Sequence, residues 1–526
     1  MLSQNRDKTT FALLSIILLS NAIFLFRHAS HYFDVYEMGA LMDAGWRILK
    51  GQLPYLDFQC SSGPVHLYLI TLFYRIFGIG KNAMLVFLIV SHSAAILLTY
   101  AMARRYCPKA IAFLTSLLTT VCFYWTISHP WPDQTAHLFG LGGVCLLIYQ
   151  TPFSSKSSAF KNGLLCGFFF ILSMATKSNV GLAYGLTFVF FFLSVEGRLQ
   201  GLLGLLLGTL LGGAIMLLVI RDPVAYYNQA FAAFYTGELA SRRLISFLIL
   251  FTYFVEWYWL IGIITLAVIE KNIKTHQPWV MLFICFYGIM IFTRFSSTIR
   301  PEANIPLSGV FLAMAFSLLF KDRENHTSTL GKIVFKSAIV MMVFFSGLLI
   351  ASSAKRGLAL NAWADGGIDS FNHYTMASRG VAGWQTSHQT GEAVDALTQL
   401  IKTYVPANDS LLVLSDLPIL YLLTNHESYE GIPVALRVNE EPPPGEPSQK
   451  ISQYVQTHTP DWIVTHKSEP STPRVTDIIP YLGLTDMINE HYMIAAQHEN
   501  YVLLVHRKRL TELTPTIVQL HQLTGV

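Results

Sequence analysis

The chain has 526 residues, of which 52% are hydrophobic and 13% are charged, and its formal net charge is +4. This composition excludes an ordinary soluble globular protein and indicates a membrane protein with several spans. The small, dispersed charge argues against a nucleic-acid partner. The six cysteines show no CxxC or metal-ligand spacing, so the sequence predicts neither a disulfide framework nor a zinc site.

Hydrophobic stretches recur along the first two thirds of the chain, each long enough to cross a hydrocarbon core of about 30 Å. The segment 64–78 is apolar too, but it is short, rich in aromatic residues and contains His66 and Arg75, so we predict a helix that lies in the interface. Glycines spaced three or four residues apart in 200–220 predict a close helix-packing face. The predicted spans are 10–27, 82–102, 110–127, 135–150, 162–176, 179–195, 200–220, 244–268, 278–293, 303–320 and 332–351.

The basic residues of the connecting loops predict the orientation of these spans. If 64–78 is interfacial, the basic loops near residues 104–109, 156–161, 198, 271–274 and 321–332 all share a side with the basic N-terminus. Short cytoplasmic loops carry an excess of Lys and Arg, so that side is predicted to be cytoplasmic. The loop 28–63 and the region after residue 351 are then external. If 64–78 crossed the membrane, every one of these basic loops would face outward.

About 175 residues of ordinary soluble composition follow the last predicted span. Short apolar runs at 411–414, 462–464 and 501–505 predict strands, and 391–404 and 448–457 predict helices, which together indicate a small α/β domain. It shows no phosphate loop, nucleophile elbow or metal motif, so we expect a lid or scaffold rather than independent catalysis. The predicted domains are 1–351, within the membrane, and 352–526, external.

Acidic residues in the external loops are candidates for a site. Asp34, Glu37 and Asp57 border the first span, where carboxylates are costly unless they are paired or hydrated. Asp133 lies in a second external loop rich in Pro and Trp. Two convergent carboxylates can serve as a general base and as a metal or hydrogen-bond partner. The alternative is that these are solvated loop acids. Asp43 belongs to a predicted helix over 37–50, and we assign it to the polar face of that helix.

Lys177, Arg294 and Arg300 are basic residues on the predicted external side, contrary to the positive-inside pattern. A group of cations there suits an anion, and Arg forks match phosphate oxygens. A lone Lys177 at a span end would instead extend to the interface. His66 and His129 could contact a phosphate or a sugar, although structural roles at the interface are favoured because nothing in the sequence fixes their geometry.

Together these residues resemble the C-type membrane glycosyltransferases, the group that includes protein O-mannosyltransferases and lipid A aminoarabinose transferases. The first external loop of that family runs Asp-Glu-Gly, a helix, Gly-x-x-Pro-Tyr-x-Asp-Phe and a Pro-containing interfacial helix. The corresponding residues here are Glu37-Met38-Gly39, Gly51-Gln-Leu-Pro54-Tyr55-Leu-Asp57-Phe58 and Gly63-Pro64. Pro132-Asp133 resembles the acid of the second loop, and Lys177-Ser-Asn179-Val-Gly181 resembles a Lys-Gln-Asn-x-Gly turn. One departure is Met38, where the family has the second acid of its pair.

The resemblance implies a polytopic α-helical enzyme of the C-type (GT-C) fold. It would move a sugar from a polyprenyl-phosphate donor to a hydroxyl of a lipid, glycan or protein at the external face. Glu37, or Asp34 one turn earlier, would deprotonate the acceptor, and Asp133 would complete the site and could hold a divalent cation such as Mg or Mn. Lys177, Arg294 and Arg300 would bind the donor phosphate. The further substrate contacts would be Tyr55, Asp57, His66, His129 and Asn179.

Two other functions stay open at the level of sequence. A transporter or flippase of polyprenyl-linked sugars would use the same cations, although no internal repeat of the kind common in transporters is evident. A lipid-binding subunit without activity would explain the missing second acid at Met38. The short loops and the lack of a disulfide framework favour a bacterial inner membrane.

Overall fold

The computed structural model describes residues 2–30, 33–123, 129–150, 155–231, 373–415, 417–427, 452–453, 455–466 and 483–509. The predicted spans 244–268, 278–293, 303–320 and 332–351 lie outside these residues, as do Arg294 and Arg300. The chain divides into two compact units. Unit 1 comprises Met1–Ala29, Ser62–His66 and Met84–Gly367, and unit 2 comprises Ser30–Ser61, Leu67–Ala83 and Ile368–Val526.

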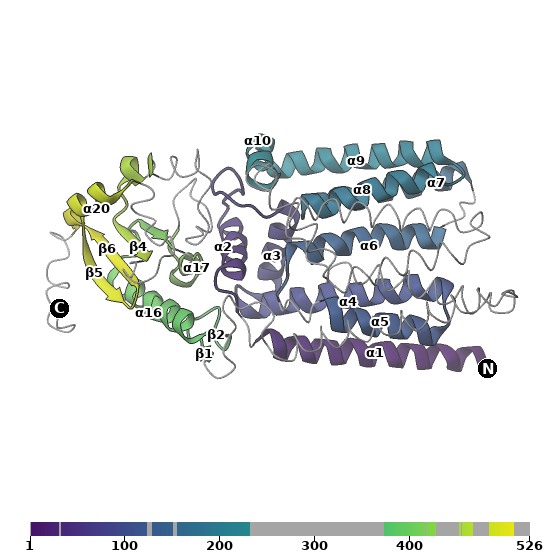
Figure 1. Ribbon diagram of the computed structural model, residues 1–526, viewed down its shortest axis with the longest axis horizontal. Helices are drawn as coiled ribbons and strands as arrows, with labels where there is room; N and C mark the ends of the chain where they lie inside the picture. The colour runs from purple at the N-terminus through teal and green to yellow at the C-terminus, as the bar shows by residue number, and fades with distance from the viewer. Residues whose placement is uncertain are drawn as a thin grey trace, which may run out of the picture. The chain divides into compact units, whose positions relative to one another are not determined.

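Long helices make up the described part of unit 1 (Figure 1). Each coincides with a span predicted from the sequence, although α1 begins eight residues earlier and α7 six residues earlier than predicted, so these seven segments are confirmed as helices. Four of them contain stretches long and apolar enough to cross a membrane, Thr10–Arg27, Lys81–Arg105, Lys156–Met174 and Arg198–Ile220. The total of eleven spans stays a prediction. The helices are α1 (Leu2–Ala29), α4 (Lys81–Tyr106), α5 (Lys109–Phe123), α6 (Pro132–Gln150), α7 (Lys156–Met174), α8 (Ser178–Leu193) and α9 (Arg198–Ile220).

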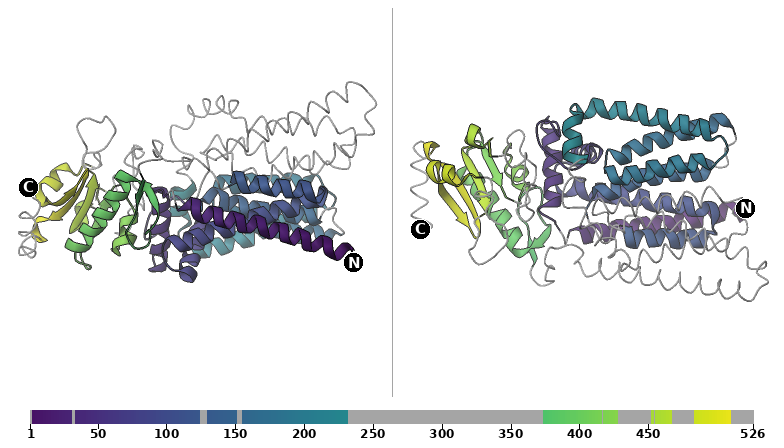
Figure 2. Two further views of the ribbon diagram at one scale, coloured as in Figure 1. Left: turned by 90° about the horizontal axis from the view of Figure 1, so that it is seen from below. Right: turned by 45° about the horizontal axis from the view of Figure 1, so that its top comes forward.

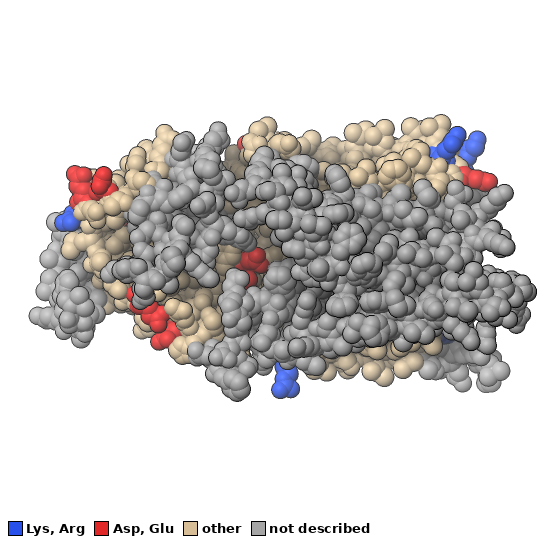
Figure 3. Space-filling view, in the orientation of Figure 1, with Lys and Arg blue, Asp and Glu red and all other residues tan. Residues whose placement is uncertain are grey.

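The outer surfaces of these helices are apolar. Phe11 of α1 is 75% exposed, and Leu210 and Leu218 of α9 are 60% and 80% exposed. On the face shown in Figure 3, the charged atoms near α7 and α9 gather at the end where these helices begin. Large apolar side chains that are mostly exposed suit a hydrocarbon environment.

The glycine face predicted in 200–220 packs α9 directly onto the backbone of α7. A Cβ atom added to Gly204 would lie 2.1 Å from the carbonyl oxygen of Phe160, and one on Gly208 would lie 2.0 Å from that of Leu164. Any side chain would therefore push the two helices apart. In the right view of Figure 2, the teal helix α9 runs alongside the neighbouring helices of unit 1. The predicted packing face is confirmed, and α7 and α9 hold the turn that follows α7 in a fixed place.

The segment between α1 and α4 forms two helices, α2 (Glu37–Leu49) and α3 (Pro64–Phe77). Within unit 2 they pack closely, because a Cβ on Gly45 would lie 2.5 Å from Ile70 Cγ2. The Thr71 hydroxyl also donates to the Gly45 carbonyl at 3.3 Å. The 14 residues of α3 span about 21 Å, less than a hydrocarbon core of about 30 Å. This length agrees with the predicted interfacial helix.

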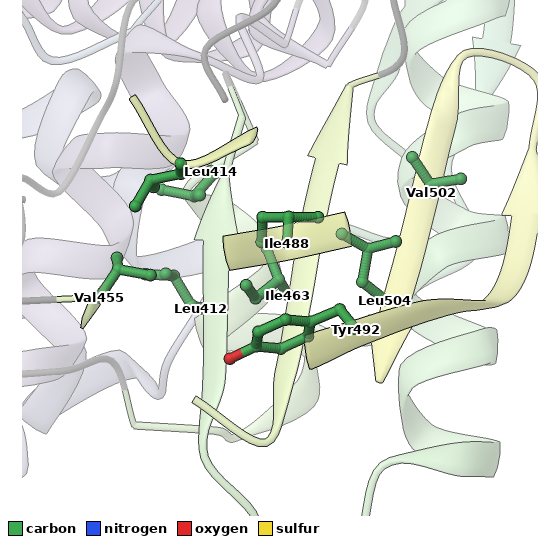
Figure 4. Packing of buried hydrophobic residues seen from close by; sticks show 9 residues of the cluster. Leu412, Leu414, Val455, Ile463, Ile488, Tyr492, Val502 and Leu504 are labelled. Carbon is green, nitrogen blue, oxygen red and sulfur yellow. The ribbon is translucent and has the colours of Figure 1, made fainter. Parts of the chain in front are cut away.

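The C-terminal region contains a four-stranded sheet in the order β3-β4-β6-β5. β3 (Leu411–Leu414) pairs parallel with β4 (Trp462–His466), and the other two pairings are antiparallel. The predicted runs form β3, β4 and β6 (Tyr501–His506), whereas β5 (Tyr492–His498) was not predicted. Leu412, Ile463 and Leu504 point into one buried cluster (Figure 4). The helices of this region are α16 (His388–Tyr404), α17 (Ile419–Thr424) and α20 (Thr485–His491).

A hairpin of β1 (His373–Thr375) and β2 (Gln385–Ser387) precedes this sheet and contacts both ends of the segment 30–83. At the first end the Phe33 ring stacks on Trp384 with 4.5 Å between centroids. The backbone bonds are Gln385 N–H to Ser30 O (2.9 Å), Phe33 N–H to Gln385 O (2.8 Å) and Lys81 N–H to Gly380 O (2.8 Å). We call residues 373–387 the hairpin strap. It joins both ends of the segment 30–83 to the C-terminal region within unit 2.

Candidate active site

Asp133 is a buried acidic residue at the start of α6 in unit 1. It is the second residue of α6, after Pro132, and it is 2% exposed. A carboxylate at this point is stabilised by the N–H groups and dipole of the helix N-terminus. Its Oδ2 accepts a hydrogen bond from the Trp131 indole N–H at 2.8 Å. This indole donor was not anticipated from the sequence, and it fixes the orientation of the carboxylate.

Lys177 provides the cation that faces this carboxylate. Its Nζ lies 3.3 Å from Asp133 Oδ1, and its side chain is 17% exposed. The residue precedes α8 in a turn closed by its own N–H, which donates to Ser173 O at 2.9 Å. The Ser173 hydroxyl donates to Ala136 O in the first turns of α6 at 2.9 Å. The two helix ends that carry the ion pair are thus bound to each other.

Gly63 allows a second segment to cross this turn. A Cβ at residue 63 would lie 2.3 Å from Ala175 O and 2.5 Å from Thr176 O, so only glycine fits. Two residues later, Val65 N–H donates to Ala175 O at 3.1 Å. The Gly63-Pro64 motif therefore has a packing reason. It brings the start of α3 against the turn that carries Lys177.

Two histidines line this region. His66 is fully buried, with its ring 5.5 Å from that of Phe87. Burial lowers the pKa of His66 to about 3, and Lys177 lowers it further while Asp133 raises it. His66 is therefore neutral at physiological pH and can hydrogen-bond but not carry charge. The His129 ring lies edge-on to Trp131 at 5.1 Å, next to the indole that orients Asp133.

Asn179 and Gly181 shape the start of α8. The Asn179 side-chain oxygen accepts the N–H of Val180 at 2.9 Å, and the residue is 3% exposed. A Cβ on Gly181 would lie 2.2 Å from the Cα of Met174 on α7. The Lys177-Ser-Asn179-Val-Gly181 sequence thus makes a tight turn between two packed helices, with a lysine at its tip.

Asp34 and Glu37 lie in unit 2, at the beginning of α2. Asp34 Oδ1 accepts the N–H groups of Tyr36 at 3.0 Å and Glu37 at 2.8 Å, as a capping side chain does. Glu37 is the first residue of α2 and is half-buried. Asp34 therefore stabilises the start of α2, and Glu37 is the first residue of that helix.

Asp57 and Tyr55 belong to a compact turn. Asp57 Oδ2 accepts the N–H of Leu53 at 2.7 Å, and Tyr55 N–H donates to Phe58 O at 2.9 Å. Tyr55 has a φ of 71°, in the left-handed region, and is buried. A strained backbone held by a local carboxylate indicates a turn with one defined shape.

Asp43 does not lie on a polar face of α2, and that prediction was wrong. Asp43 is fully buried, and its Oδ2 accepts the Nε–H of Arg47 at 2.6 Å, four residues further along the helix. Burial raises the pKa of Asp43 from 3.8 to about 6, against the influence of Arg47. The pair was missed because an i,i+4 pair of opposite charge usually marks a solvated helix face.

Among the described residues, no three His, Cys, Asp or Glu side chains gather where they could hold a metal ion. Asp133, the predicted ligand, contacts a lysine and an indole N–H instead. These residues do not fit a metal site, and no step below depends on one. Arg294 and Arg300, the predicted partners of Lys177, lie outside the described residues.

Comparisons with solved structures define the class of fold. ArnT from Cupriavidus metallidurans bound to undecaprenyl phosphate matches with a TM-score of 0.55 and 14% identity, over 94% of this chain and 97% of that one. Its apo form matches with a TM-score of 0.53 and 15% identity, over 96% and 98%. AglB, the oligosaccharyltransferase from Archaeoglobus fulgidus, in complex with an inhibitory peptide and a dolichol-phosphate, matches with 0.52 and 11%, over 88% and 70%. The chain has the C-type membrane glycosyltransferase fold.

Within that class, residues 61–227 match the family model described as dolichyl-phosphate-mannose-protein mannosyltransferase. The matched segment contains Gly63, His66, Asp133 and Lys177, and it begins after the loop that holds Glu37. The resemblance drawn from the sequence is therefore confirmed. A comparison with curated protein sequences gives no match.

Proposed function

We propose that the chain is a membrane glycosyltransferase that takes a sugar from a polyprenyl-phosphate donor and transfers it to an acceptor hydroxyl at the external face. The observation that carries the proposal is the Lys177–Asp133 pair, which lies where the family model and the fold both match. The ArnT and AglB structures hold undecaprenyl phosphate and a dolichol-phosphate, respectively. These ligands are lipid phosphates of the class proposed here.

The position of Lys177 supports a phosphate ligand. The lysine directly precedes α8, so its charge lies beside the positive end of the helix dipole, which disfavours a cation by about 0.3–1 kcal/mol. Helix stability does not explain a lysine at this place. An anion would be attracted by the lysine and by the N–H groups of the helix start together.

The proposed reaction is a single displacement. The acceptor oxygen attacks the anomeric carbon of the sugar, and the bond from that carbon to the phosphate oxygen breaks with its electron pair on the phosphate. Glu37 accepts the proton of the acceptor hydroxyl. Lys177, with Arg294 and Arg300, stabilises the leaving phosphate. Asp133 holds Lys177 in place, and His66, neutral when buried, offers a hydrogen bond rather than a charge.

Asp34 and Asp57 have supporting parts in this proposal. Each gives one carboxylate oxygen to backbone N–H groups and so has a local structural role. Glu37 is therefore assigned as the base, and Asp34 as the cap that sets the direction of α2. Tyr55, His129 and Asn179 are assigned to shaping the site. We place the protein in a bacterial inner membrane with its C-terminal region outside.

The test compares variants with matched controls in cells. Glu37→Gln and Lys177→Ala should each cause undecaprenyl- or dolichyl-phosphate sugars to accumulate, measured by mass spectrometry of extracted lipids. The controls are Glu196→Gln and Lys156→Ala, which change the same residue types at the predicted cytoplasmic ends of the helices. We expect at least a 100-fold loss of donor turnover in the two site variants and wild-type turnover in the controls. Normal turnover in both site variants would overturn the assigned roles.

A further inference from the structure

Arg47 is a charged side chain that the reaction proposed above does not use. It lies on α2, ten residues after Glu37, and its side chain is 1% exposed. The single hydrogen bond described for its guanidinium is Nε–H to Asp43. Among the described residues, its two terminal nitrogens have no hydrogen-bond partner. A buried ion pair contributes little net stability compared with apolar side chains of the same volume, so stability alone does not explain it.

The guanidinium lies against two aromatic rings from different segments. Its central carbon is 5.4 Å from the ring centre of Phe58 and 5.1 Å from that of Tyr421. Phe58 is fully buried at the end of the turn that holds Asp57, and Tyr421 lies on α17 of the C-terminal region. A planar guanidinium can stack on aromatic faces in a way that a lysine ammonium cannot. One side chain therefore joins α2, the turn and α17.

Each of these partners is itself held in place. The Tyr421 hydroxyl accepts the N–H of Val413 in the central sheet at 2.8 Å. The turn is tied back to α2 by Gln52 N–H, which donates to Arg47 O at 3.1 Å. The Arg47 guanidinium thus lies between Phe58 of the turn and Tyr421 of α17. Its position determines where α2 packs against both.

α17 also contacts α2 near the proposed base. A Cβ on Gly39 would lie 3.2 Å from Ile419 Cβ, so the first turn of α2 packs against the start of α17. α17 therefore meets α2 at two places, beside Glu37 and at Arg47. A shift of Arg47 against Tyr421 would rotate or slide α2 on α17 and displace the Glu37 carboxylate.

We propose that Arg47 is a positioning residue for sugar transfer, which aligns Glu37 with the acceptor by clamping α2 between Phe58 and Tyr421. This inference rests on the proposed function and deepens it. Arg47 touches no reacting group. A displacement of about 1 Å at a catalytic group can cost on the order of 100-fold in rate. The C-terminal region thereby contributes to the alignment of the site, although it carries no catalytic motif.

The experiment uses the full-length protein in proteoliposomes, with undecaprenyl-phosphate-mannose as the donor probe and a bacterial membrane extract as the acceptor source. Arg47→Lys keeps the charge but loses the planar stack, and Tyr421→Leu removes one ring. We expect kcat to fall 10- to 100-fold in both, with the KM for the donor within twofold of wild type. Tyr421→Phe keeps the ring but loses the hydroxyl that accepts the Val413 N–H, so it should retain more activity than Tyr421→Leu. Lys50→Ala is the matched control, because Lys50 is an exposed cation directly after the last residue of α2, 5.5 Å from the Trp46 ring.

Hydrogen exchange of the backbone gives a readout that does not require turnover. Peptides covering residues 33–45 should exchange faster in Arg47→Lys and Tyr421→Leu, and at the wild-type rate in Lys50→Ala. Unchanged exchange, or a rise in donor KM with unchanged kcat, overturns the positioning role. A wild-type protein that turns over no donor, together with unaltered lipid pools in Glu37→Gln and Lys177→Ala cells, overturns the proposed function instead. The two failures are therefore distinguishable.

Discussion

Replacing Gly63 by alanine should destabilise the junction that carries Lys177. The added Cβ would lie 2.3 Å from Ala175 O and 2.5 Å from Thr176 O, about 1 Å inside normal carbon–oxygen contact. Both obstructing atoms belong to the backbone, so no side-chain rotation relieves the overlap. Overpacking costs about 1–3 kcal/mol, and the hydrogen bond from Val65 N–H to Ala175 O contributes about 0.5–1.5 kcal/mol that would be lost as the segments separate.

The expected loss of unfolding free energy is therefore about 2–4 kcal/mol, which corresponds to a decrease in Tm on the order of 3–8 °C. Thermal unfolding of the protein in nanodiscs, followed by tryptophan fluorescence, measures it. Gly213→Ala is the control, because a Cβ there meets no heavy atom within 4 Å, and its Tm should stay the same or rise slightly. Donor turnover should fall in Gly63→Ala, since Lys177 moves relative to Asp133. A variant with wild-type Tm and wild-type turnover would refute the packing argument.

Three further outcomes follow from the described contacts. Asp34→Ala should lower the unfolding free energy by about 1 kcal/mol because two N–H groups lose their acceptor. Asp34→Asn should lower the unfolding free energy by less, and equal losses in the two variants would contradict the capping role. Asp57→Ala should lower the unfolding free energy by about 1 kcal/mol, because the Leu53 N–H loses its acceptor. A loss of activity of more than 100-fold at unchanged stability would contradict a structural role for Asp57. Burial raises the pKa of Asp43 from 3.8 to about 6, so the folded protein holds that proton more tightly than the unfolded one. The unfolding free energy should then fall as pH rises from about 4 to 6, by an amount on the order of 3 kcal/mol, and level off above. Asp43→Asn should remove this fall in pH-dependent thermal melts.

The helices of unit 1 were predictable because hydrophobic length alone specifies them. In a bilayer, a long apolar run has to satisfy its backbone hydrogen bonds internally, so a helix is the one structure available to it. Strands β3, β4 and β6 were predictable for a related reason, since their runs are continuously buried. β5 was missed because Met493 and Ile494 are partly exposed at the edge of the sheet, which removes the clear apolar pattern.

The candidate site was predictable in part. The basic-residue pattern predicted Lys177 and Asp133 as candidates on the same side of the membrane. Their contact depends on the packing of α6 on α7, which no local sequence pattern encodes. Trp131 as the donor to Asp133 could have been suspected, because the two residues are adjacent to Pro132 at a helix start. Arg47 and Tyr421 are far apart in the chain, and no local pattern links them.

The hairpin strap has a consequence for the order in which the chain assembles. Ser30 and Lys81 emerge from the ribosome early, whereas the strap residues that bind them follow roughly 300 residues later, which at 5–20 residues per second is a delay of about 15–60 s. Through that interval the ends of the segment 30–83 lack their partners in the strap. Glu37 and its helix can reach their final alignment once the C-terminal region has been made. A nascent or truncated chain would thus sit in the membrane with its spans formed and its acidic loop still unfastened, so the completed chain is a precondition for the aligned site.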